Sequence, residues 1–256
     1  METFRKRLIL SLILNILMIF LFISSIINEI VEIYINPDST YQTVWGLFRF
    51  FTFDGNLLSC IFNCIIVFKQ IKSLRLNNEQ SIKEKTISNF LYLIGLISAS
   101  NEIIIFVVVV FIFLPMADRE WMLALIGSYR TSSVHITIPI LLTFRFLFLD
   151  TREKELKFYE KFIGGIPMVI YGTIMYSLCL AKVFTSYNKE EGDAKIPYLF
   201  FDVYHQERQF CLLIILFIFA FGFAISMIFD FLNKKLEKAI FSCDSIEEII
   251  IDRKEN

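Results

Sequence analysis

The chain alternates between long apolar runs and shorter segments that carry most of its charged residues. Each run is long enough to cross the hydrocarbon core of a bilayer, which takes about 20 helical residues. The pattern therefore predicts an all-α membrane protein with six transmembrane helices. The expected helices are Leu8 to Ile27, Leu47 to Phe68, Ile87 to Phe113, Thr131 to Leu149, Phe162 to Phe184 and Phe210 to Phe231.

Composition agrees with this class. Hydrophobic residues make up 56% of the 256 positions and charged residues 20%, with a mean hydropathy of +0.61, which is too apolar for a soluble domain. Only 9 Gly and 5 Pro are present, so a barrel with many tight turns is not favoured. The net charge is −1, so there is no basic field to hold nucleic acid, and we expect lipid partners instead.

The distribution of Lys and Arg between the runs predicts the orientation. These residues cluster at positions 5–7, 69–85, 152–161 and 234–254, all on one side of a six-helix topology. Because short cytoplasmic segments are enriched in Lys and Arg, we expect both termini in the cytoplasm. The chain then divides into a transmembrane domain at 1–231 and a cytoplasmic tail at 232–256.

The second predicted helix carries a polar face inside its apolar run. Its members recur at steps of three and four residues, which places them on one side of a helix: Arg49, Thr52, Asn56, Ser59 and Asn63. Polar groups avoid lipid, so this face should point into the bundle. It predicts either a seam of hydrogen bonds between helices or a site that holds a ligand.

The fourth helix carries His135, one of only 2 histidines in the chain. At about 1.5 Å of rise per residue, Thr52 and His135 lie at similar depths below the outer boundary of the membrane. A hydroxyl beside an imidazole is the arrangement in which a base activates a weak nucleophile. This hypothesis requires the second and fourth helices to be neighbours.

Four other charged residues lie within or near the apolar runs. Arg145, close to the cytoplasmic end of its helix, is expected to extend its long side chain to the interface. Arg49 and Lys182 either do the same at the outer side or bind a carboxylate there. Glu102, near the middle of the third helix, is expected to make a structural hydrogen bond, to orient His135 or to serve a proton path.

Three segments resemble a known family. They are Phe51-Thr52-Phe53-Asp54-Gly55-Asn56-Leu57-Leu58, His135 with Pro139, and Pro197-Tyr198-Leu199-Phe200-Phe201-Asp202-Val203. They look like the androgen-induced and androgen-dependent TFPI-regulating membrane proteins, and most like their bacterial six-helix relatives, which usually have Ser where this chain has Gly55.

That resemblance implies an intramembrane threonine hydrolase of fatty acid esters of hydroxy fatty acids. Thr52 and His135 match the nucleophile and the base in their motifs, and Tyr198 and Asp202 match an outer-loop motif. If the activity is present, the amide of Asn56, one turn from Thr52, is a possible oxyanion donor; the alternative is a hydrogen bond between helices.

Two further functions stay open on the sequence. One is an ion-coupled transporter that uses Glu102, Arg49 and Lys182 as an intramembrane charge path. The other is a lipid-binding protein without catalysis. For the lipid ester hydrolase we expect no cofactor and no metal site, a membrane lipid or fatty acid ester as the partner, no nucleic acid, and a bacterial plasma membrane as the location.

Overall fold

The computed structural model describes residues 2–35, 50–75, 89–113, 123, 127–150, 155–183, 201 and 207–255. Within these residues the fold is helical, and six stretches are long and apolar enough to cross a membrane. The predicted all-α class, with six helices long and apolar enough to span a membrane, is therefore confirmed. The elements are α1 (Glu2–Ile35), α2 (Phe51–Arg75), α3 (Asn89–Val107), η3 (Val108–Phe113), α6 (Tyr129–Ser132), η4 (Ser133–Thr137), α7 (Ile138–Phe148), η5 (Phe158–Gly165), α8 (Ile166–Leu180) and α9 (Arg208–Glu255).

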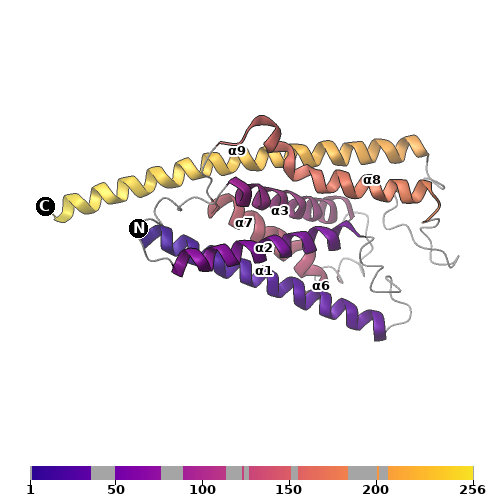
Figure 1. The fold of residues 1–256 in the computed structure, drawn as a ribbon, viewed down its shortest axis with the longest axis horizontal. Coiled ribbons are helices and arrows are strands. Elements are labelled where there is room, and N and C mark those ends of the chain that lie inside the picture. Colours follow the sequence, from indigo (N-terminus) through magenta and orange to yellow (C-terminus); the bar gives the residue numbers. More distant parts are fainter. Residues whose placement is uncertain are drawn as a thin grey trace.

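The third span is the centre of the bundle. In Figure 1, α3 lies between the pair α8 and α9 and the pair α1 and α2, and it also contacts α7. Of its most apolar stretch, 61% is buried, against 33% or less for the other five spans. Its Ser98, Asn101 and Glu102 are therefore enclosed by protein on all sides.

Apolar side chains cover the outside of the bundle and polar ones lie within it. Phe20, Phe68 and Phe217 are each more than 60% exposed, whereas Asn15 and Asn63 are fully buried. This is the reverse of a soluble protein, because lipid solvates Phe and Ile but offers no partner to an amide. The distribution is that of a bundle surrounded by lipid.

The fourth span changes its helical type on either side of a proline. It begins as α6, widens into the π-helical η4, and continues as α7, with Pro139 in the first turn of α7. Proline has no backbone N–H, so the carbonyl of His135 loses the donor that a regular α-helix would supply. The backbone N–H of Ile138 instead reaches back to the carbonyl of Ser133, which is the wider spacing of a π-helix.

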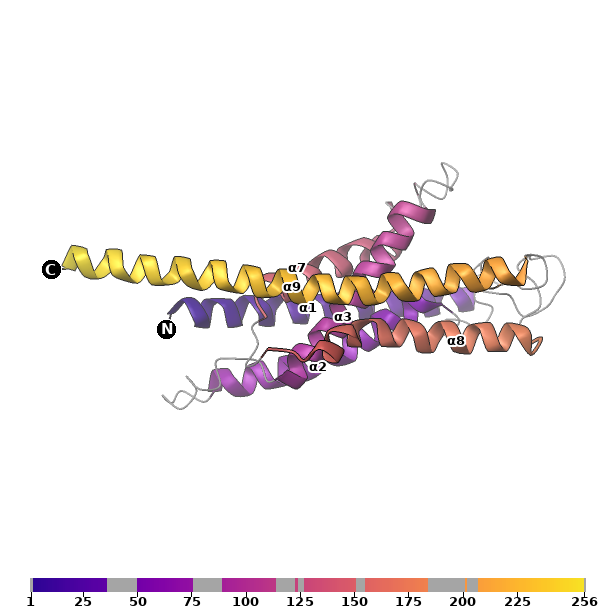
Figure 2. The ribbon, with the colours of Figure 1, turned by 90° about the horizontal axis from the view of Figure 1, so that it is seen from above.

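The last helix is much longer than its membrane-spanning part. It runs from Arg208 to Glu255 without interruption, so the predicted boundary at residue 231 falls inside a helix. Asn233, beyond that boundary, is fully buried against the fourth span. Figures 1 and 2 show that the two termini lie at the same end of the bundle, as an even number of spans requires.

Candidate functional site

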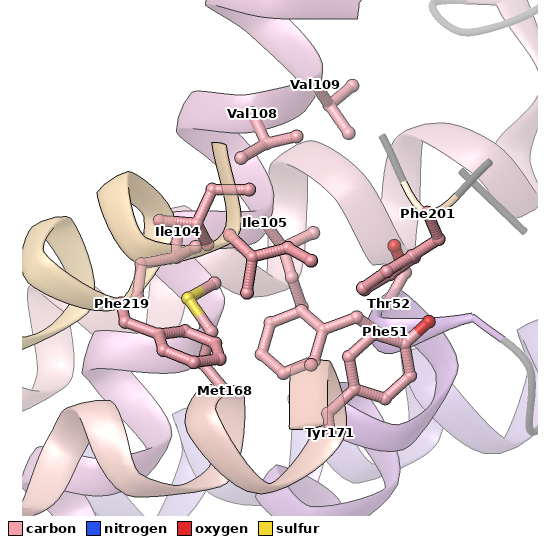
Figure 3. Close-up of a pocket in the computed structure, with 13 residues that line it drawn as sticks. Phe51, Thr52, Ile104, Ile105, Val108, Val109, Met168, Tyr171, Phe201 and Phe219 are labelled. Atoms are coloured by element: carbon pink, nitrogen blue, oxygen red, sulfur yellow. The ribbon is translucent and has the colours of Figure 1, made fainter. Parts of the chain in front are cut away.

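Thr52 lies in the first turn of α2, at the wall of an apolar pocket. The pocket is enclosed by α2, α3, α8 and α9, and its lining includes Phe51, Ile104, Met168, Tyr171, Phe201 and Phe219. Figure 3 shows Thr52 at one edge of the pocket, beside Phe51, Tyr171 and Phe201. Apart from Tyr171, Thr52 is the one hydroxyl side chain among the lining residues described. The pocket thus offers an apolar surface with a hydroxyl group at its border.

A hydrogen bond brings the turn that holds Thr52 next to the segment that holds His135. The amide nitrogen of Asn56 donates to the carbonyl of Thr52 at 2.8 Å and to the carbonyl of Val134 at 3.2 Å. The second and fourth spans are therefore neighbours at this level, as the hypothesis required. Within the described chain, no hydrogen bond joins the hydroxyl of Thr52 directly to the ring of His135, and the buried Nδ1 of His135 has no partner.

The two hydrogen bonds of Asn56 use both N–H groups of its amide. The side chain is 1% exposed, and its Oδ1 is buried without a partner among the described residues. In this arrangement the amide makes the contact between helices that the sequence allowed as its alternative role. An oxyanion would have to compete with the carbonyl of Val134 for the same donor.

Glu102 lies at the centre of the bundle and is fully buried. Ser59 of α2 faces its carboxyl group. Neither carboxylate oxygen of Glu102 has a hydrogen-bond partner in the described part of the chain, and the same holds for the hydroxyl of Ser59. The described structure therefore shows no direct hydrogen bond between Glu102 and His135. No contact supports the predicted role of Glu102 in orienting His135.

The expectation for Arg145 is wrong. Its side chain does not extend to the interface but is 0% exposed. Its NH1 group donates to Asn15 Oδ1 at 2.6 Å and to Asn63 Oδ1 at 3.1 Å, and NH2 lies 3.0 Å from Asp150 Oδ2. Asp150 follows the end of the fourth span and lies within reach, so pairing inside the protein replaces contact with water. Burial raises the pKa of the Asp150 carboxyl, and the Arg145 guanidinium opposes that shift.

This ion pair belongs to a wider polar network that sequence reasoning missed. Asn15 donates to Gln70, Gln70 donates to Ser11, and Asn233 donates to the carbonyls of Phe146 and Asp150. The network connects the first, second, fourth and sixth spans. Asn15 and Ser11, both inside the first apolar run, could have predicted this network, because isolated polar residues in a membrane span need hydrogen-bond partners within the bundle.

Of the other predicted site residues that the structure describes, Asn56, Glu102, His135 and Lys182 are not among the lining residues of the pocket. Lys182 lies beyond the end of α8, is exposed, and has a positive φ of 61°. It closes that helix in the left-handed conformation, with the N–H of Val183 bonded to the carbonyl of Leu178 at 3.0 Å. Arg49, Tyr198 and Asp202 lie outside the described residues.

A scan against protein-family models and searches of curated proteins and of solved structures found no match to this chain.

Proposed function

We propose that the protein is an integral-membrane hydrolase of lipid esters, with Thr52 as the nucleophile and His135 as the base. The position of Thr52 at the border of the apolar pocket carries this proposal. An acyl chain would lie against Ile104, Met168 and Phe219, with its ester group near the hydroxyl. Apolar walls with few polar groups are typical of sites that bind such chains.

In this proposal the Oγ of Thr52 attacks the ester carbonyl carbon while His135 accepts the hydroxyl proton. The proton then passes to the leaving alcohol, and water hydrolyses the acyl-threonine intermediate. The hydrogen bond from the amide nitrogen of Asn56 to the carbonyl oxygen of Val134, at 3.2 Å, supports the pairing of Thr52 with His135. It joins the turn that holds Thr52 to the segment that holds His135. The direct contact is expected to form with substrate, since catalytic hydrogen bonds often tighten only in the complex.

The substrate class that fits best is a fatty acid ester of a hydroxy fatty acid. The resemblance of the Thr52 and His135 motifs supports this class, and the aromatic and aliphatic lining of the pocket is compatible with an acyl group. The predicted roles of Arg49, Tyr198 and Asp202 at the outer side remain part of this proposal. Lys182 is not included, because it is exposed beyond the end of α8 and is not among the lining residues of the pocket.

We place the protein in a bacterial plasma membrane, with both termini in the cytoplasm. The clusters of Lys and Arg on one side of the six spans support this orientation. The pocket then opens in the outer half of the membrane, because Thr52 is at the start of the second span.

Covalent labelling with a fluorophosphonate tests the proposal, because the probe reacts with an activated hydroxyl. We expect labelling of the wild-type protein and its loss in both Thr52→Ala and His135→Ala. Thr173→Ala is the matched control, since Thr173 is exposed on α8 and is not among the lining residues described. It should label like the wild type.

The three variants are compared at equal amounts of folded protein, judged by gel filtration in detergent. Absence of labelling in folded wild-type protein would contradict the hydrolase and favour lipid binding without catalysis. Labelling that persists in Thr52→Ala would place the nucleophile elsewhere. A positive result would be followed by a screen of lipid esters, with product release measured by mass spectrometry.

A further inference from the structure

The buried carboxyl group of Glu102 has no ion-pair partner in the described structure, which distinguishes it from the other buried acids. Asp150 pairs with Arg145, Asp230 with Lys161, and Glu29 with Arg130. Glu102 lies within the third span, in the second half of α3, and is 0% exposed. An ionised carboxylate is very costly there, so its charge requires a counter-ion or a proton.

The register of α2 against α3 shows which groups face Glu102. The two helices are consecutive spans that pack against each other, and a Cβ at Gly55 would lie 2.9 Å from Ile105 Cδ1. One turn further along, Ser59 faces Glu102. Ser98 lies one turn from Glu102 on the same face of α3. The carboxyl group therefore has a hydroxyl across the interface and another beside it.

The oxygen atoms in this region share one property. Each is buried and has no hydrogen-bond partner among the described residues: Ser59 Oγ, Ser98 Oγ, Asn101 Oδ1, and both Oε atoms of Glu102. One N–H of the Asn101 amide donates to the carbonyl of Ile97 at 2.8 Å, whereas its oxygen has no partner among the described residues. The two hydroxyls can also donate, but in the described structure all five oxygens have unused lone pairs.

We propose that Glu102, Ser59, Ser98 and Asn101 form an intramembrane binding site for a monovalent metal cation, Na⁺ in the first place. Hydroxyl, amide and carboxylate oxygens are the ligands of hard cations. A single carboxylate balances one positive charge. Within the described residues no group of three or more His, Cys, Asp or Glu side chains forms a metal site, so a divalent or transition metal is not favoured.

This site is separate from the proposed hydrolase, because none of its four residues lines the pocket that Thr52 borders, as far as that lining is described. Cation binding and ester hydrolysis can therefore succeed or fail independently. Thr52→Ala should abolish labelling by the fluorophosphonate and leave cation binding unchanged.

Thermal unfolding of the full-length protein in detergent tests the cation site. The buffer contains NaCl, KCl or choline chloride at one ionic strength and one pH. At about ten times the dissociation constant, a specific cation should raise the midpoint by about 3–6 °C relative to choline. Na⁺ should be more effective than K⁺. The rise should vanish in Glu102→Gln and become smaller in Ser98→Ala.

Ser25→Ala is the matched control, because Ser25 is also a buried serine but bonds within its own helix to the carbonyl of Leu21. It should keep the full Na⁺ effect. Equal midpoints in Na⁺ and choline for the wild type would overturn the proposal, and so would an undiminished effect in folded Glu102→Gln. If Glu102→Gln does not fold, equilibrium binding of radioactive Na⁺ to the wild type and to Ser98→Ala decides. Saturable binding that Ser98→Ala weakens supports the site, and absence of binding overturns it.

Discussion

At the scale of single residues, Arg145 shows how a charged side chain is accommodated inside a membrane bundle. Its guanidinium group is fully buried and contacts two amide oxygens, of Asn15 and Asn63, besides the carboxylate of Asp150. The fork of donors on Arg suits several acceptors at once, which Lys cannot match. The ion pair is worth little in itself, but each partner depends on the other to remain buried.

Arg145→Ala is therefore expected to lower the free energy of unfolding by about 3–5 kcal/mol, because it leaves Asp150 buried without a counter-charge. Lys234→Ala is the control, since Lys234 pairs with Glu155 at the exposed surface and its loss should cost about 0–1 kcal/mol. Thermal unfolding in detergent measures both. If the double variant Arg145→Met with Asp150→Leu were no more stable than Arg145→Ala, the explanation by an unpaired charge would be wrong.

At the scale of elements, the contact of η5 with α3 and α9 depends on the absence of a side chain. The backbone N–H of Gly164 donates to Ser226 Oγ at 3.1 Å, and that hydroxyl donates to the carbonyl of Lys161 at 2.6 Å. A Cβ at Gly164 would come within 2.6 Å of Ser226 Oγ and still closer to Ser100 Oγ. Three spans meet here with no room for a methyl group.

Gly164→Ala is expected to destabilise the protein by about 1–3 kcal/mol, because the added methyl group forces η5 away from α9. Gly127→Ala is the control, since nothing lies within 4 Å of a Cβ at that position in the described structure. The melting temperatures of the two variants provide the comparison. A Gly164→Ala protein as stable as Gly127→Ala would show that η5 and α9 can separate at no cost.

At the scale of the whole molecule, six spans bring the two termini to one end of the bundle, where α9 extends beyond the other helices (Figure 1). In the sequence, Lys and Arg concentrate in the N-terminal segment, in the tail, and in the segments after the second and fourth spans. Segments rich in Lys and Arg are retained in the cytoplasm during membrane insertion. The expected orientation therefore depends on the charge distribution over the whole chain and not on one helix.

Fusions to alkaline phosphatase test this orientation, because the enzyme needs disulfides that form outside the cytoplasm. We expect a fusion after Asn256 to be inactive and a fusion after Glu191, between the fifth and sixth spans, to be active. Immunoblots of both fusions control for expression. High activity of the Asn256 fusion would reverse the proposed topology.

The helical class of the fold and the approximate positions of the six spans could be predicted from the sequence. Apolar runs of sufficient length specify spanning helices because a backbone in lipid must satisfy its own hydrogen bonds. Their ends were less predictable: α1 continues past Ile27 to Ile35, and α9 continues past Phe231 to Glu255. The polar face of α2 was also readable, and Asn56, Ser59 and Asn63 are buried as that face predicts.

The partners of the polar groups were decided only by the tertiary structure. The sequence by itself determined which residues are too polar to face lipid, because that depends on each side chain and its helical period. It did not determine that Asn56 bonds to Val134, that Arg145 turns inward to Asp150, or that Glu102 faces Ser59. Those contacts join residues far apart in the chain, and they exist only once the packing order and register of the helices are set.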